Sequence, residues 1–77
     1  MLIAIKYFGM LTEATHCVEE TIDFSGSYIS ELLEELFAKH PALRDKDFQV
    51  AQDKELVPFN TKISSKELVL LPPFSGG

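Results

Sequence analysis

Apolar and polar residues alternate over the first eight positions of the chain. Ile3, Ile5 and Tyr7 share one parity and Lys6 lies on the other, which is the period of a strand with one fully apolar face. We therefore expect the Ile3 side to be buried and the Lys6 side to face outward. Residues 9–16 predict a loop and residues 17–24 predict a second strand, so the two strands should form a hairpin.

The strongest helical pattern lies between residues 27 and 41. Its apolar residues recur at i, i+3, i+4, i+7 and i+8, and they form one stripe: Ile29, Leu32, Leu33, Leu36 and Phe37. Ser27 is the expected N-cap, and Pro41 is expected to stop the helix. An apolar stripe of this kind must pack on another element, which predicts that the helix covers a sheet.

The remainder of the chain predicts short strands over residues 47–52, 55–57 and 67–71, and Pro72 and Pro73 should end the last one because neither can donate a ladder hydrogen bond. The order is then β, β, α, β, β, β, without repeats. It predicts an α+β fold of the β-grasp type, with a mixed sheet of four to five strands and one main helix packed on one face. We expect a domain over residues 1–73 and a flexible tail over residues 74–77.

Charge and cysteine content narrow the classes of function. Twelve acidic and seven basic side chains give a formal net charge of −5, which argues against nucleic acid as a partner. Cys17 is the only cysteine, so an intramolecular disulfide and a multi-thiolate metal cluster are excluded, and a reducing, cytoplasmic location is expected. No apolar run approaches the roughly 20 residues that span a bilayer, so no membrane partner is expected.

The body of the chain lacks recognisable catalytic motifs. Its four glycines form no phosphate-binding loop, so any ATP chemistry is expected to belong to a partner. His16 and His40 lack metal-ligand spacing and are expected at the surface or at a helix end, and we expect no metal site. Cys17 beside His16 could serve as a nucleophile, but neighbours on a strand point to opposite faces, so a core position for Cys17 is preferred.

The sequence ends in two bare glycines, Gly76 and Gly77. A terminal carboxylate is ionised at neutral pH, and once a partner enzyme has adenylated it, a thiol, persulfide or amine can attack it. Glycine has no Cβ, so such an end can pass through a narrow channel, and residues 74–77 extend about 13 Å. Phe74 favours docking in a partner's groove, whereas a frayed end is the alternative interpretation.

Four stretches together suggest a family. They are YFG at 7–9, ISELLEELFAKHPAL at 29–43, ELVPFNTKI at 55–63 and above all ELVLLPPFSGG at 67–77. With the length and the element order, they resemble the small, sulfur-carrier subunit of molybdopterin synthase, a ubiquitin-like protein of the MoaD/ThiS family. SSKE at 64–67 departs from the Gly-Asp turn that is frequent in this family, which concerns the turn type and not the tail.

The resemblance implies a cycle that several proteins share. A ubiquitin-activating-enzyme-like adenylyltransferase would use ATP to adenylate Gly77, and a sulfur donor protein would convert the adenylate to a thiocarboxylate. The tail would then enter the large subunit of molybdopterin synthase, within a heterotetramer, and sulfur would pass to cyclic pyranopterin monophosphate. Gly77 would carry the sulfur, and this chain would bind no cofactor itself. The docking arm would consist of Gly76, Ser75, Phe74, Pro73 and Pro72.

The alternation of the strands also predicts a partner surface. Phe8 lies on the outward Lys6 parity, and outward apolar residues on a sheet mark an interaction site when they form a patch. We expect Phe8, Leu56 and Leu71, with Pro72 beside them, to form this surface. A carrier for thiamine biosynthesis, a dual-use carrier that also becomes attached to lysines, and an interaction module with an inert tail are the alternatives.

Overall fold

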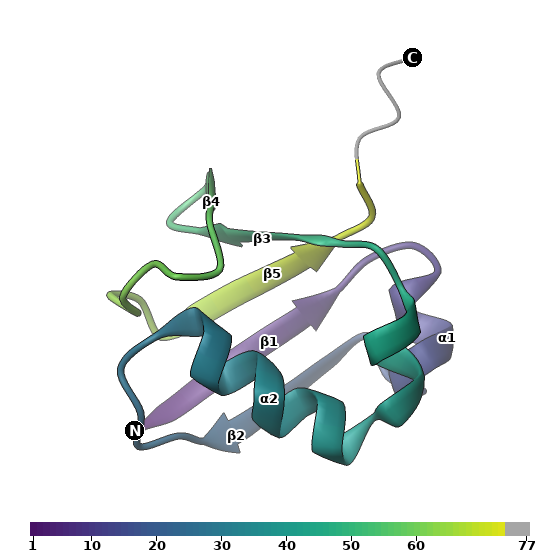
Figure 1. Ribbon diagram of the computed structural model, residues 1–77, viewed down its shortest axis with the longest axis horizontal. Coiled ribbons are helices and arrows are strands. Elements are labelled where there is room, and N and C mark those ends of the chain that lie inside the picture. The colour runs from purple at the N-terminus through teal and green to yellow at the C-terminus, as the bar shows by residue number, and fades with distance from the viewer. Residues whose placement is uncertain (74–77) are drawn as a thin grey trace.

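The structure is a computed structural model, and it describes residues 1–73. A five-stranded mixed sheet carries one long helix across one face (Figure 1). The elements in chain order are β1 (Leu2–Tyr7), α1 (Leu11–Thr15), β2 (Glu19–Asp23), α2 (Ile29–Lys39), the 3₁₀ helix η1 (Pro41–Asp45), β3 (Gln49–Gln52), β4 (Glu55–Val57) and β5 (Glu67–Leu71). The expected α+β class and the β-grasp arrangement are confirmed.

The strands lie side by side in the order β2-β1-β5-β3-β4. The last strand, β5, is inserted between β1 and β3, parallel to the first and antiparallel to the second. Ile5 pairs with Leu68, and Tyr7 pairs with Leu70, so these four residues share one face of the sheet. Because β1 and β5 are parallel, their carboxyl ends reach the same edge of the sheet.

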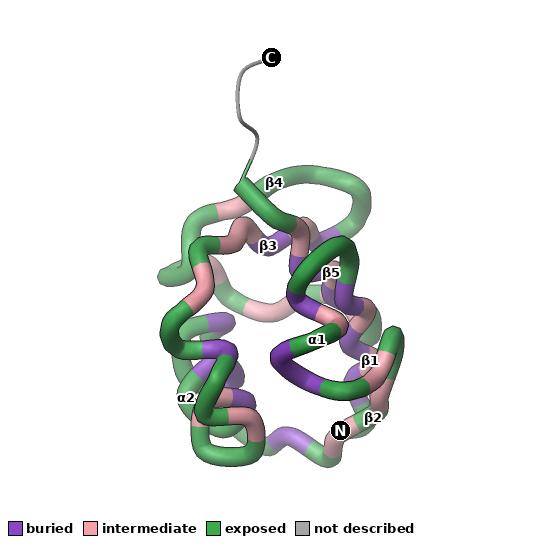
Figure 2. Tube along the Cα trace, turned by 90° about the vertical axis from the view of Figure 1, so that its right-hand side faces the viewer, coloured by how far each residue is buried: buried purple, intermediate pink, exposed green. Residues whose placement is uncertain are grey.

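The core lies between α2 and the sheet, as the buried segments in Figure 2 show. Ile3, Ile5 and Tyr7 are buried, and the alternate residues of β1 are not, which confirms the predicted parity. The helix stripe supplies the facing side of the core with Ile29, Leu32, Leu33 and Leu36, and Phe37 packs at its margin. Burial of such side chains stabilises the fold by about 1.5–3 kcal/mol each.

Two local predictions differ from the structure. The expected loop over residues 9–16 contains the short helix α1, whose buried Leu11 and Ala14 close one end of the core. The N-cap of α2 is Tyr28 and not Ser27, because the segment before the helix is extended and Ser27 accepts a backbone hydrogen bond from Ile63. The helix α2 ends at Lys39, before Pro41 as predicted, and Pro41 begins η1.

At the start of α2, the side chain of Glu31 binds the backbone N–H groups that precede the helix. The Glu31 carboxylate accepts hydrogen bonds from the backbone N–H groups of Ser27 and Tyr28, at 2.9 and 2.8 Å. These bonds hold the pKa of Glu31 below its usual value.

Within residues 1–73, no helix has the length and apolar character required to cross a bilayer.

Candidate functional site

The base of the C-terminal tail is held against the turn that follows β1. The Phe8 amide donates a hydrogen bond to the Leu70 carbonyl oxygen at 3.1 Å. Gly9 comes next with φ of +60°, and a Cβ built on it would lie 2.7 Å from Cγ of Pro72. Gly9 is therefore required twice: for its left-handed backbone and for the close approach of Pro72. Gly9 belongs to the YFG stretch at residues 7–9, but the sequence alone does not indicate this role.

The outward face of the sheet carries an apolar hollow that leads to this tail base. It has a volume of about 550 Å³ and is lined by Phe8, Gln49, Ala51, Lys54, Leu56, Val69, Leu71 and Pro72. The register explains the grouping, since Leu56 pairs with Ala51 and Ala51 pairs with Val69 on one face of β4, β3 and β5. The structure thus brings together the four residues predicted as a partner surface, and their role in binding stays a prediction.

The remainder of this face, over β1 and β2, includes charged side chains. Lys6 forms an ion pair of 3.3 Å with Glu67, and Glu19 pairs with Lys6 in the strand register. Leu56 and Phe8 are about half exposed, at 57% and 48%. A face with an apolar hollow beside the tail and charged side chains beyond it fits a partner that buries the hollow and leaves the charged side chains in contact with water.

The predicted sulfur-carrying end itself lies outside the described residues. Phe74, Ser75, Gly76 and Gly77 belong to this segment. Pro72 and Pro73 are described and exposed, and the chain leaves the sheet at this point (Figure 1). The assignment of the tail therefore stays a prediction, while the surface from which it starts is defined.

A second polar cluster lies on the opposite face of the sheet, centred on Glu20 of β2. Its Oε1 accepts a hydrogen bond from Lys39 Nζ at 2.5 Å, and its Oε2 accepts one from the Tyr7 hydroxyl at 2.6 Å. His40 Nε2 lies 2.6 Å from the same Oε2. One carboxylate therefore links the first two strands to the carboxyl end of α2.

The electrostatics of this cluster follow from burial and hydrogen bonding. Burial alone raises the pKa of the Glu20 carboxyl, but the hydrogen bonds from its three partners outweigh burial and hold that pKa below its usual value. Burial, and then the bond to Glu20, raises the pKa of the Tyr7 hydroxyl far above its usual value. Glu20 is therefore an anion at neutral pH, and the Tyr7 hydroxyl keeps its proton and donates a hydrogen bond to it.

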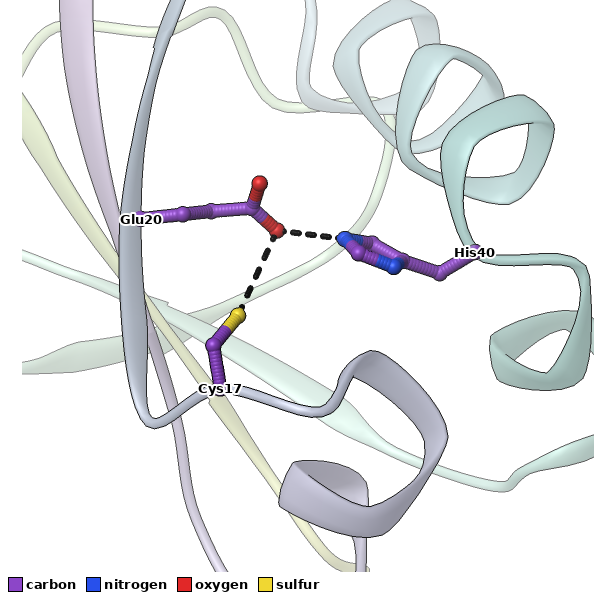
Figure 3. A group of neighbouring side chains, drawn as sticks. All are labelled: Cys17, Glu20 and His40. Carbon is purple, nitrogen blue, oxygen red and sulfur yellow. Dashed lines mark hydrogen bonds and ion pairs between the residues drawn. The ribbon is translucent and has the colours of Figure 1, made fainter.

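Cys17 and His40 join Glu20 in a group that no sequence motif predicted. Cys17 Sγ lies 4.0 Å from Glu20 Oε2, and one ligand atom from each of the three residues lies within 4.8 Å of the others. Figure 3 shows the three side chains converging from β2, from the end of α2 and from the segment between α1 and β2. His40 lies at a helix end and His16 at the surface, as predicted, but Cys17 is only half-buried.

Comparisons with known proteins identify a matching family and similar solved structures. A family model described as "ThiS family" matches residues 5–77. SAMP1 from Haloferax volcanii has 26% identity and a TM-score of 0.81, over 100% of both chains. A putative molybdopterin converting factor, subunit 1, from Pyrococcus furiosus has 19% identity and a TM-score of 0.86, over 96% of this chain and 99% of that one.

A third similar structure is small archaeal modifier protein 1 from Methanosarcina acetivorans. It has 22% identity and a TM-score of 0.75, over 99% of this chain and 96% of that one. At their low identities, this protein and the Pyrococcus furiosus protein support the fold alone. The family model covers nearly the whole chain, including both glycines of the tail. The chain therefore belongs to the ThiS family, whose ubiquitin-like β-grasp fold it has.

Proposed function

We propose that this protein is a sulfur carrier whose Gly77 carboxylate is converted to a thiocarboxylate by partner enzymes. The observation that carries the proposal is the match to the ThiS family through residue 77, with an apolar hollow at the point where the tail leaves the sheet. The hollow would hold the domain on a partner while the tail reaches the partner's active site. About 13 Å of extended chain beyond Pro73 is available for this purpose.

The chemistry of the hollow supports a carrier more than a catalyst. Among the described residues that line it, Lys54 is the only ionisable one. General acid–base catalysis needs a proton donor or acceptor within hydrogen-bond reach of the reacting group, and an apolar lining offers docking area instead. In this proposal, the activating enzyme supplies the ATP chemistry and a separate sulfur donor protein supplies the sulfur.

We further propose that the sulfur acceptor is the precursor of molybdopterin and that this chain is the small subunit of molybdopterin synthase. The supporting observations are the Pro-Pro-Phe-Ser-Gly-Gly ending and the fold shared with a putative molybdopterin converting factor. The large subunit of the synthase would bind the hollow and receive the tail. The active complex would then be a heterotetramer with two copies of this chain.

A second candidate function comes from the likeness to SAMP1. A protein from Methanosarcina acetivorans with that name is described as a modifier, and the Haloferax volcanii protein is 26% identical to this chain. In this alternative, the activated Gly77 carboxylate forms an amide with a lysine of another protein. Both functions need the same adenylated end, so the product that accumulates distinguishes them.

Intact mass spectrometry tests the carrier function directly. The untagged full chain is incubated with its cognate activating enzyme, ATP and a sulfur source, and its mass is compared before and after. We expect a gain that corresponds to one oxygen replaced by sulfur, localised to Gly77. Two matched variants serve as controls: deletion of Gly76 and Gly77, and addition of one alanine after Gly77. Both should keep the thermal unfolding midpoint and lose the mass gain.

The alternatives predict different outcomes in the same assay. An unchanged mass, with an activating enzyme that modifies a control carrier, would reject the carrier function and favour an interaction module with an inert tail. Transfer of the whole chain to lysines, with or without the mass gain, would favour the modifier. Transfer of sulfur to cyclic pyranopterin monophosphate on addition of the large subunit would support the synthase.

The hollow can be tested apart from the tail. Leu56→Asp introduces a charge into its lining, and Val18→Asp introduces the same charge at an exposed site just before β2 that does not line the hollow. We expect Leu56→Asp to weaken binding to the large subunit by at least about 1 kcal/mol, a factor of roughly five, and Val18→Asp to leave it unchanged. Equal affinities of the two variants would show that the hollow is not the docking face.

A further inference from the structure

A side-chain cluster on the opposite face of the sheet from the hollow has the composition of a metal site. Cys17, Glu20 and His40 supply a thiol, a carboxylate and an imidazole, and their ligand atoms all lie within 4.8 Å of one another. We infer that these three residues form a binding site for a thiophilic divalent cation, with Zn²⁺ as the expected ion. This inference does not depend on the sulfur-carrier proposal.

The distances are close to those that Zn²⁺ requires. With Zn–S of about 2.3 Å and Zn–N and Zn–O of about 2.0–2.2 Å, a tetrahedral site separates its ligand atoms by roughly 3.3–3.6 Å. His40 Nε2 is 2.6 Å from Glu20 Oε2, and Cys17 Sγ is 4.0 Å from the same oxygen. The ion would therefore replace the hydrogen bond between His40 and Glu20, and changes of about 1.2 Å or less in the separations of the ligand atoms would complete the geometry.

The surroundings of Glu20 would hold it as a ligand. Tyr7 donates a hydrogen bond to Oε2, which keeps a second lone pair for a cation, and Lys39 holds the other oxygen, Oε1. Neighbours of this kind fix the orientation of metal-binding carboxylates in proteins. The side chains of Glu20 and His40 are 11% and 12% exposed, so the site is sheltered but open to entry from solvent.

The ligand types determine which ion is expected. A thiolate and an imidazole select Zn²⁺ and related ions over Mg²⁺ and Ca²⁺, which prefer oxygen ligands. Three protein ligands leave one tetrahedral position for water. A bound ion would connect three segments that are separate in the sequence: the turn before β2, β2 itself and the end of α2 (Figure 3).

The expectation of no metal site rested on spacing along the chain. Cys17 and Glu20 are three residues apart, but His40 follows only after another twenty positions, so no short motif connects the three. The fold brings them together because Glu20 faces the same side of the sheet as its strand partner Ile5, the side that α2 covers. The proximity of these three side chains is therefore visible only in the structure.

Metal titration of the untagged, reduced full chain tests the inference. Equilibrium dialysis with Zn²⁺ should give one bound ion per chain, and Co²⁺ as a spectroscopic probe should give a thiolate-to-metal charge-transfer band. Zn²⁺ should also raise the thermal unfolding midpoint, because an ion that binds only the folded state stabilises it. Absence of the band and of any shift in the midpoint for the wild-type chain would overturn the inference without the use of a variant.

Matched variants locate the site. Cys17→Ser should abolish the charge-transfer band, and His40→Gln should weaken Zn²⁺ binding at least about tenfold, since even indirect support of a ligand contributes this much. His16→Gln is the control, because His16 is exposed, adjacent to Cys17 and outside the cluster. Circular dichroism verifies that each variant is folded. Equal loss in His16→Gln and His40→Gln, or an unchanged band in Cys17→Ser, would reject this site.

Discussion

Substitution of Gly9 by alanine should weaken the fold at the base of the tail. The residue has φ of +60°, and the added Cβ would lie 2.7 Å from Pro72 Cγ. The left-handed backbone costs a non-glycine residue about 1–2 kcal/mol. Relief of the contact requires a shift of roughly 1 Å, because carbon atoms pack at about 3.5–4.0 Å. Pro72 is exposed and can move, so this second contribution should be the smaller one.

The total loss of unfolding free energy should be about 1–3 kcal/mol. For a domain of this size, each kcal/mol lowers Tm by about 4–8 °C, so thermal unfolding followed by circular dichroism should show a decrease of roughly 5–20 °C. Urea unfolding gives the free energy independently. A Gly9→Ala protein with an unchanged Tm would refute the assignment of backbone strain and close approach at this position.

Two further variants separate the two contributions. Gly9→Asn keeps the added Cβ but tolerates the left-handed backbone better, so it should lose less stability than Gly9→Ala. Pro72→Ala removes the Cγ atom, so the cost of Gly9→Ala should be smaller in that background. A double-mutant cycle with zero coupling would show that Pro72 does not contact the added methyl group. If the carrier proposal holds, Gly9→Ala should also slow thiocarboxylate formation, since it displaces the base of the tail.

Three other changes test polar side-chain contacts of the described fold. Gln52 is 5% exposed and its side-chain amide binds backbone groups of residues 62–64, so Gln52→Ala should cost about 1–3 kcal/mol in urea unfolding. Tyr7→Phe removes the hydrogen bond to Glu20 and should cost roughly 1.5 kcal/mol, and no loss would contradict the geometry. The pKa of Glu31 in the folded state is lowered from 4.5, so the stability that the ionised carboxylate contributes is present above pH 4.5 and is lost as the pH falls through the lowered pKa. The difference in Tm between wild type and Glu31→Gln should therefore shrink in acid. A difference that stays constant with pH would argue against this role of Glu31.

The sequence predicted the elements whose side chains repeat with a clear period. The alternation of Ile3, Ile5 and Tyr7 located a buried strand face, and the stripe from Ile29 to Leu36 located the helix that covers it. The five-residue helix α1 is too short to show such a period, so its segment looked like a loop. The cap of α2 was misplaced because the pairing of residues 27–28 with the distant 61–63 segment fixes it.

The candidate sites divide in a similar way. The alternation of the strands predicted that Phe8 and Leu71 face outward. The sheet order brings Leu56 beside them, so the three residues form one surface as predicted. The group of Cys17, Glu20 and His40 could not be predicted, because Cys17 precedes β2, Glu20 lies in β2 and His40 follows α2, and only the packing of these elements joins them. Contacts between elements carry this information, and local periodicity does not.

The central position of β5 has a consequence for how the molecule folds. The hairpin of β1 and β2 and the pairing of β3 with β4 are local, but Ala4 meets Glu67 only when the two parts of the sheet come together around β5. Contacts of such large sequence separation are entropically expensive and slow folding. The strand that presents the tail is therefore also the one that completes the sheet, so an incompletely folded chain cannot display the tail base and the hollow in their final arrangement.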